Sequence, residues 1–79
     1  MKKKIAILGA TGSIGLQTVD VIVHHPEMFE CVSLSVGHQI NKLKEILTQL
    51  TPRVVCVIEK EDCLMLQNEY PHIEFVYGD

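Results

Sequence analysis

Four short runs of apolar residues divide the chain at regular intervals. They occupy residues 5–8, 31–36, 54–58 and 73–77, and the third is rich in β-branched side chains. Apolar runs of four to eight residues that end at glycine, proline or polar residues are typical of buried strands. The pattern therefore predicts four β-strands, of which the last is partly alternating.

Helical periodicity fills the three intervals between these runs and predicts helices over residues 13–24, 40–50 and 59–70. The middle helix has apolar residues at helical spacing: Ile40, Leu43, Ile46, Leu47 and Leu50. The first helix is apolar over much of its surface, so we expect it to be largely covered. Each helix is followed by a proline, which cannot continue it: Pro26, Pro52 and Pro71.

The resulting order β-α-β-α-β-α-β is typical of an α/β fold. Continuous apolar strands indicate burial on both sides, so we expect a parallel sheet with helices on both faces and right-handed crossovers. No repeat or linker interrupts the pattern. Because nothing follows the fourth strand to cover it, we expect residues 1–79 to be the N-terminal part of a longer protein.

Composition narrows the class of protein. The 79 residues include 7 Lys+Arg and 10 Asp+Glu, for a formal net charge of −3, and the only basic run is residues 2–4. Nucleic-acid binding is therefore not expected, and no apolar stretch is long enough for a membrane helix or a signal peptide. The three cysteines stand singly, without metal-ligand spacing. Unpaired thiols suit a reducing cytoplasm.

The segment between the first strand and the first helix carries the main chemical signal. Its glycines, Gly9, Gly12 and Gly15, have the spacing G-x-x-G-x-x-G, a relative of the dinucleotide-binding fingerprint of Rossmann-like domains. In that fingerprint one glycine permits the turn, the next lets the pyrophosphate approach the backbone, and the third lets the helix pack on the sheet. We expect the N–H groups around Ser13 and Ile14 to face the phosphates.

Two other interpretations of this segment fit the sequence less well. A plain strand-to-helix turn tolerates glycine without binding anything, but the position between a clear strand and a clear helix favours nucleotide binding. A phosphate-binding P-loop requires Gly-Lys followed by Ser or Thr. Here Gly15 is followed by Leu16, so the P-loop fits less well.

The end of the second strand indicates which dinucleotide is bound. NAD-binding domains usually place an acidic residue there to hold the ribose 2′-hydroxyl. This strand ends instead in Gly37, His38 and Gln39, which present donors and no carboxylate. We therefore expect NADP(H), with His38 as a candidate contact to the 2′-phosphate; an exposed loop histidine without a ligand is the alternative.

The remaining polar residues have simpler interpretations. The adjacent histidines His24 and His25 end the first predicted helix, where a cation favours the helix dipole, and they do not form a metal site. Asp20 is expected to be exposed. Acidic residues gather where the third helix begins, which the dipole also explains: Glu59, Glu61 and Asp62.

Several segments together resemble the start of the 1-deoxy-D-xylulose-5-phosphate reductoisomerase family. They are the glycine loop within residues 7–15, the stretch at 17–22, the His-Pro-Glu turn at 25–30 and the strand end at 34–37. The resemblance covers residues 4–58 and is much more specific than the glycine loop alone. It implies that Thr11, Gly12, Ser13 and Ile14 bind NADPH, as do Gly37, His38 and Gln39.

The resemblance also implies an activity for the longer protein. Members of the family convert 1-deoxy-D-xylulose 5-phosphate to 2-C-methyl-D-erythritol 4-phosphate in non-mevalonate isoprenoid biosynthesis, with NADPH and with Mg or Mn, and are typically homodimers. Family members are several times longer than this chain. Their catalytic and C-terminal domains lie beyond residue 79, so no catalytic or metal-binding residue is expected within this chain.

Two features leave room for alternatives. The family usually has Lys or Arg and then Asn where this chain has His38 and Gln39, which affects how strongly the 2′-phosphate is held. Another NADP-dependent oxidoreductase, such as a relative of the semialdehyde dehydrogenases, shares the same loop. A non-catalytic nucleotide-binding module is the third possibility.

Overall fold

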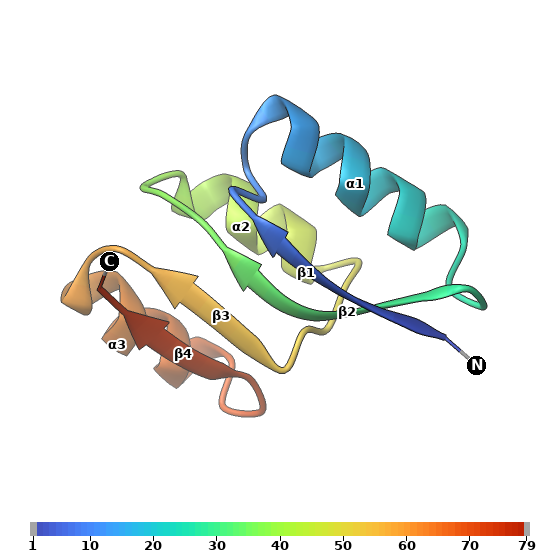
Figure 1. Cartoon of the computed structure of the whole chain (residues 1–79). Helices are drawn as coiled ribbons and strands as arrows, with labels where there is room; N and C mark the ends of the chain where they lie inside the picture. The colour runs from blue at the N-terminus through green and yellow to red at the C-terminus, as the bar shows by residue number, and fades with distance from the viewer. Residues whose placement is uncertain (1, 79) are drawn as a thin grey trace.

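The computed structural model describes residues 2–78. Seven elements follow one another along the chain: β1 (Lys3–Leu8), α1 (Ser13–His24), β2 (Phe29–Ser35), α2 (Ile40–Leu47), β3 (Val54–Val57), α3 (Lys60–Glu69) and β4 (Glu74–Tyr77). The predicted element order is confirmed (Figure 1). The second helix ends three residues earlier than predicted, although Leu50 beyond it is still buried.

The four strands form one parallel sheet in the order β1-β2-β3-β4. The predicted α/β fold and parallel sheet are therefore confirmed. One register shift interrupts the pairing of β1 with β2, between Ile5 and Ala6. All four strands run the same way, so the loops that follow β1, β2 and β3 meet at one edge of the sheet, the carboxyl edge.

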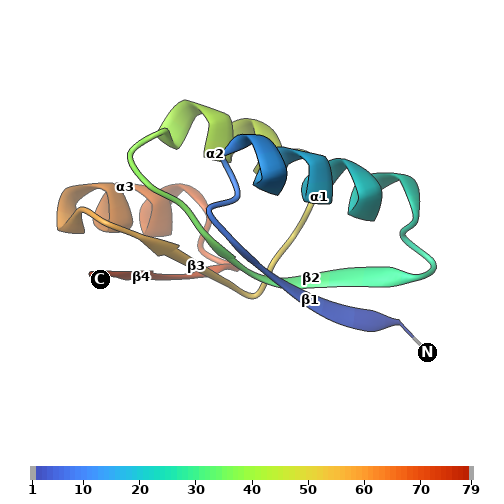
Figure 2. The same ribbon diagram turned by 45° about the horizontal axis from the view of Figure 1, so that its top comes forward.

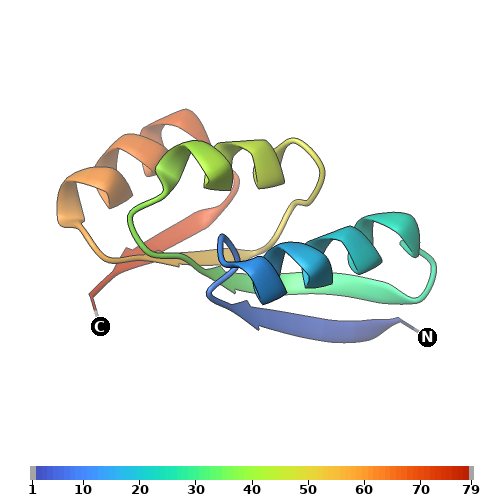
Figure 3. The ribbon, with the colours of Figure 1, turned by 90° about the horizontal axis from the view of Figure 1, so that it is seen from above.

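The expectation of helices on both faces is wrong for these residues. All three helices lie on the same side of the sheet, as Figures 2 and 3 show. The reason is topological. Each strand is followed by its immediate neighbour in the sheet, and successive right-handed crossovers that step in one direction place every helix on the same face.

Burial follows this one-sided arrangement. Paired positions form a row of buried side chains beneath the helices: Ile7, Leu34, Val55 and Phe75. The next row along points to the uncovered face and contains Leu8, Ser35, Cys56 and Val76. Leu8 is 85% exposed and Val76 38% exposed. The strands thus carry more apolar side chains than the one covered face of the sheet can bury.

The first helix is also less covered than its sequence suggests. Only Gly15, Val19 and Ile22 are buried, whereas Ile14 is 79% and Val21 48% exposed. One stripe of α1 packs on β1 and β2, Leu16 and Val23 are half-buried beside it, and the outer side of the helix is exposed. The expectation that α1 is largely covered is therefore wrong.

Candidate cofactor-binding site

The glycine loop turns the chain sharply between β1 and α1. Gly9 has a φ of +67°, a left-handed conformation that costs a residue with a Cβ roughly 1–2 kcal/mol. The Gly12 N–H donates to the Gly9 carbonyl oxygen at 3.0 Å and closes the turn. The Ala10 N–H donates to the Ser35 carbonyl oxygen at 2.9 Å, which ties the loop to the end of β2.

Gly15 allows the helix to lie directly against this turn. A Cβ at Gly15 would stand 2.2 Å from the Gly9 carbonyl oxygen and 2.7 Å from the Ala10 Cα. Both atoms belong to the backbone, so no side-chain rotation relieves the overlap. The predicted role of Gly15 in close packing of the helix is confirmed by this geometry.

The beginning of α1 is open to an anion. Its first internal hydrogen bond runs from the Leu16 N–H to the Gly12 carbonyl oxygen at 2.9 Å, so the N–H groups of Ser13, Ile14 and Gly15 have no partner within the helix. No side chain caps the helix, and no acidic residue lies in its first turn. Free donors and the positive end of the helix dipole together favour a bound phosphate.

A cleft of about 500 Å³ opens beside these donors. Its walls are the end of β1, from Ala6 to Leu8, and the first turns of α1 as far as Thr18. Ser13 and Ile14 are exposed at its rim. Thr11, in contrast, is only 6% exposed, so its side chain helps to build the loop and leaves little surface for a ligand.

The second predicted segment lies at the same edge of the sheet. The Val36 N–H donates to the Cys56 carbonyl oxygen at 3.0 Å, and the Ile40 N–H donates to that of His38 at 2.9 Å. Between them Gly37 is half-buried, and His38 and Gln39 are exposed. Because β1 and β2 are adjacent and parallel, this loop stands beside the glycine loop. The structure thus brings the two predicted segments together.

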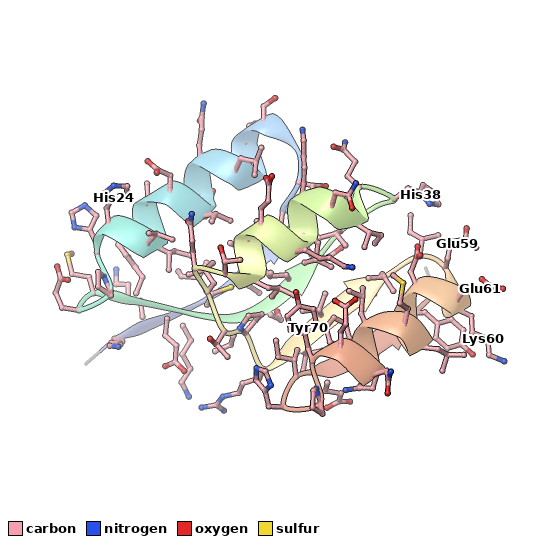
Figure 4. All side chains as sticks on the ribbon, turned by 180° about the vertical axis from the view of Figure 1, so that it is seen from behind. His24, His38, Glu59, Lys60, Glu61 and Tyr70 are labelled. Carbon is pink, nitrogen blue, oxygen red and sulfur yellow. The ribbon has the colours of Figure 1, made fainter. Side chains whose placement is uncertain are left out.

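The charge at the beginnings of the three helices differs along the carboxyl edge of the sheet. Neither α1 nor α2 has an acidic residue in its first turn or a side-chain cap, whereas α3 has Glu61 and Asp62 there and begins after Glu59. Figure 4 shows Glu59, Lys60 and Glu61 at the beginning of α3. Anions are therefore favoured at the ends of β1 and β2 and disfavoured at the end of β3.

The other polar residues take structural positions. The His24 Nδ1 lies 2.8 Å from the Asp20 carbonyl oxygen and 3.3 Å from its carboxylate, in the last turn of α1. Burial raises the pKa of the Cys31 thiol. Within residues 2–78, no three His, Cys, Asp or Glu side chains gather as a metal site would require. No helix in that range is long and apolar enough to span a membrane.

Comparison with known proteins identifies the family. The family model for 1-deoxy-D-xylulose 5-phosphate reductoisomerase matches residues 5–79, nearly the whole chain. The chain belongs to the 1-deoxy-D-xylulose 5-phosphate reductoisomerase family. This membership favours the predicted resemblance over another NADP-dependent oxidoreductase that shares only the glycine loop.

Curated reductoisomerases share this similarity over nearly all of the chain. The enzyme of Lysinibacillus sphaericus is 46% identical over 76 residues, and that of Listeria welshimeri is 41% identical over 76. In both cases the match covers 96% of this chain and 20% of the relative. The chain therefore spans about one fifth of the length of the curated reductoisomerases that it matches.

Solved reductoisomerase structures share the fold. The enzyme of Zymomonas mobilis in complex with NADPH superimposes with a TM-score of 0.86 at 20% identity, over 99% of this chain and 21% of that one. A reductoisomerase in complex with NADPH, fosmidomycin and magnesium gives 0.85 at 27% identity, over 98% and 20%. The Rossmann-like arrangement of the four strands is thus the one found in the reductoisomerases.

The sequence interpretation missed part of the cleft. Ala6, Leu8 and Thr18 line it but were not singled out. Leu8 could have been identified from the sequence, because it is the last apolar residue before the glycine turn. In a sheet that is covered on one face only, its side chain lies outside the core. Thr18 gave no such signal, since its hydroxyl simply donates to the Ile14 carbonyl oxygen at 3.1 Å, as threonines within helices often do.

Proposed function

We propose that this chain binds NADP(H), with the pyrophosphate on the first turn of α1. The observation that carries the proposal is the combination of three partnerless N–H groups, an uncapped and acid-free helix end, and the close packing of Gly15 on Gly9 and Ala10. A pyrophosphate would supply the missing hydrogen-bond acceptors at this helix end. Gly9, Gly12, Ser13, Ile14 and Gly15 would form this part of the site, on the framework that Thr11 helps to build.

The adenosine end of the cofactor would lie over the loop after β2. Its residues Gly37, His38 and Gln39 offer N–H donors, and no carboxylate of α1 or α2 lies in a first helical turn. An acid at this position would repel a 2′-phosphate, and its absence removes the usual partner of the NAD ribose. We therefore propose a preference for NADPH over NADH.

The reaction we propose for the whole protein is the one for which its family is named. A reductoisomerase of full length would convert 1-deoxy-D-xylulose 5-phosphate to 2-C-methyl-D-erythritol 4-phosphate in isoprenoid biosynthesis. Bound NADPH supplies the hydride, while the protein supplies position. The residues described here would orient the cofactor, and the Mg or Mn ligands and the contacts to the sugar phosphate would come from other segments.

The uncovered face of the sheet supports a place within a larger domain. Leu8, Cys56 and Val76 lie there in one row with Ser35, and no described element covers this row. Exposed apolar rows of this kind usually mark packing surfaces. We propose that residues 1–79 form the N-terminal part of the NADP(H)-binding domain, and that other segments of a protein as long as its relatives cover this face.

Two finer assignments complete the proposal. We place the protein in the cytoplasm, because its three cysteines, Cys31, Cys56 and Cys63, are all free and a reducing compartment keeps them so. We also propose that the whole protein is a homodimer, as its family resemblance implies. Size-exclusion chromatography with light scattering on the full-length protein tests the second assignment.

The sharpest test of the cofactor site separates binding from folding. Ser13→Glu adds a negative charge at the first position of α1, where acids stabilise a helix but repel a phosphate. A carboxylate about 5 Å from the pyrophosphate costs on the order of 3 kcal/mol in partly screened surroundings. We expect at least roughly tenfold weaker NADPH binding by calorimetry, with unchanged or higher thermal stability.

Gln17→Glu is the matched control. It introduces the same charge on the same helix one turn later, at an exposed position outside the residues that line the cleft. We expect a much smaller loss of NADPH affinity than for Ser13→Glu, because this carboxylate stands about one helical turn, roughly 5 Å, farther from the pyrophosphate and is more strongly screened. Equal affinities for Ser13→Glu and the unaltered chain would refute the proposed pyrophosphate position.

A further inference from the structure

The loop after β2 places a single histidine where the proposed site meets the cofactor 2′-phosphate. His38 lies between the buried Val36 and the beginning of α2 at Ile40. Figure 4 shows it in the loop before the beginning of α2, projecting away from the body of the molecule. It is exposed, and no hydrogen bond or ion pair joins its ring to another residue in the described range 2–78.

The charged groups at this edge of the sheet come from α2 and from the segment after β3. On its own side, α2 begins without a side-chain cap or an acid in its first turn, and Lys42 follows within that turn. From the neighbouring strand end, Glu59, Lys60 and Glu61 lie at the same edge. From the glycine loop comes no charged side chain, and the first turn of α1 contains no acid.

These groups have opposite effects on a positive charge at His38. The acids after β3 favour a positive imidazolium, while Lys42 and the positive end of α2 oppose it and favour an anion in the space between. A phosphate bound there would gain from a charge on His38, because hydrogen bonds between ionised partners are about twice as strong as neutral ones. Histidine is the side chain whose charge ordinarily changes between about pH 5 and 8.

We propose that His38 makes the choice between NADPH and NADH depend on pH, with its imidazolium form holding the 2′-phosphate. The inference rests on the proposed NADP(H) site and adds a regulation to it. At lower pH the protonated ring donates to the phosphate and the preference for NADPH grows. At higher pH the neutral ring offers a weaker hydrogen bond and the preference falls.

The sign of the effect follows from linkage. A bound dianion stabilises the imidazolium over the neutral ring, so NADPH binding takes up a proton and tightens as the pH falls. A phosphate monoester itself takes up a proton with a pKa of about 6, which opposes further gain below that value. The informative window therefore runs from about pH 6.5 to pH 8.5.

The experiment measures the dissociation constants of NADPH and NADH across this window by calorimetry. The variants are His38→Gln and His38→Lys, with His24→Gln as the control, because His24 is also exposed but lies at the far end of α1. For the unaltered chain and His24→Gln we expect NADPH to bind about threefold to fivefold more tightly at the lower limit, as for a solvent-exposed charge pair. NADH affinity should not change with pH.

The variants distinguish the sources of the pH dependence. His38→Gln should bind NADPH with the weaker, pH-independent affinity, and His38→Lys with the tighter affinity throughout the window. A pH dependence that persists in His38→Gln, or an affinity for NADPH that is flat in the unaltered chain, overturns the pH-dependent role of His38 but leaves the NADP(H) site standing. Binding of neither nucleotide at any pH overturns the proposed function and this inference with it.

Discussion

Gly15→Ala tests the packing of the glycine loop most severely. The added Cβ would stand 2.2 Å from the Gly9 carbonyl oxygen and 2.9 Å from the Ala10 carbonyl carbon. Neither atom can move without displacing the turn, so α1 must shift away from β1. Overpacking of this kind costs about 1–3 kcal/mol or more, whereas alanine gains up to about 1 kcal/mol over glycine in a helix.

Because the overlaps are all with backbone atoms, the cost lies at the upper end of this range, and the balance predicts a net loss of about 2 kcal/mol in the free energy of unfolding. For a domain of this size the loss corresponds to a fall in Tm of roughly 8 to 16 °C. Urea unfolding followed by circular dichroism measures the difference, and the m-value should not change. NADPH affinity should also fall, because the N–H groups of Ser13 and Ile14 move with the helix.

Two other glycines separate the possible causes. A Cβ at Gly37 meets nothing within 4 Å, so Gly37→Ala should change stability by no more than about 0.5 kcal/mol. A Cβ at Gly9 also meets nothing, but its φ is +67°, so Gly9→Ala should cost about 1–2 kcal/mol through backbone conformation alone. If Gly15→Ala is as stable as the unaltered chain, the close contact between α1 and the turn is refuted.

Further predictions concern the two faces of the sheet. Leu34→Ala should lower the free energy of unfolding by about 2–5 kcal/mol, because Leu34 is 1% exposed. Leu8→Ala should lower it by at most about 0.5 kcal/mol, since Leu8 is 85% exposed. Chemical denaturation measures both losses, and equal losses would contradict the one-sided core. Cys56, which is half-buried on the uncovered face, should react with a maleimide before the buried Cys31, whose thiol pKa is raised by burial. Mass spectrometry of the partly labelled chain identifies the labelled cysteine, and faster reaction at Cys31 would contradict this order. Because the pKa of Cys31 is raised in the folded state, the contribution of this thiol to stability is complete below the pKa of the unfolded thiol. It is lost as the pH rises through the folded value. The free energy of unfolding should therefore decline above about pH 9, and the Cys31→Ala variant should lack this decline.

The elements of this fold could be predicted because local signals agreed with one another. The helix of residues 13–24 has the observed bounds of α1, since glycine precedes it and Pro26 follows it. The four strands were evident from β-branched and apolar runs. The predicted end of α2 is three residues too late, because Leu50 continues the apolar spacing and is buried although the helix ends at Leu47.

The arrangement of the helices could not be predicted in the same way. Apolar strands such as Val54–Val57 indicate that both faces of the sheet are suited to burial, but they do not say which segments cover them. Strand order decides this, and strand order depends on contacts between residues far apart in the chain. The sequence pattern is consistent with burial on both sides, while residues 2–78 cover only one side.

The candidate site was predictable where it depended on backbone geometry. Gly9 and Gly15 have the conformation and the packing that their spacing indicated. The placement of the loop at 37–39 beside them followed from adjacent parallel strands. The burial of Thr11 was not predictable, because a polar residue in an exposed-looking loop carries no signal that its side chain turns inward.

The most direct test of the central claim is an NMR titration of the ¹⁵N-labelled chain with NADPH. We expect the largest amide shifts at Ser13, Ile14 and Gly15 and in the loop at 37–39, because these N–H groups would face the pyrophosphate and the 2′-phosphate. The amides at the beginning of α3, where Glu61 and Asp62 lie, should change little. Shifts centred on α3, or no shifts at saturating NADPH, would contradict the account.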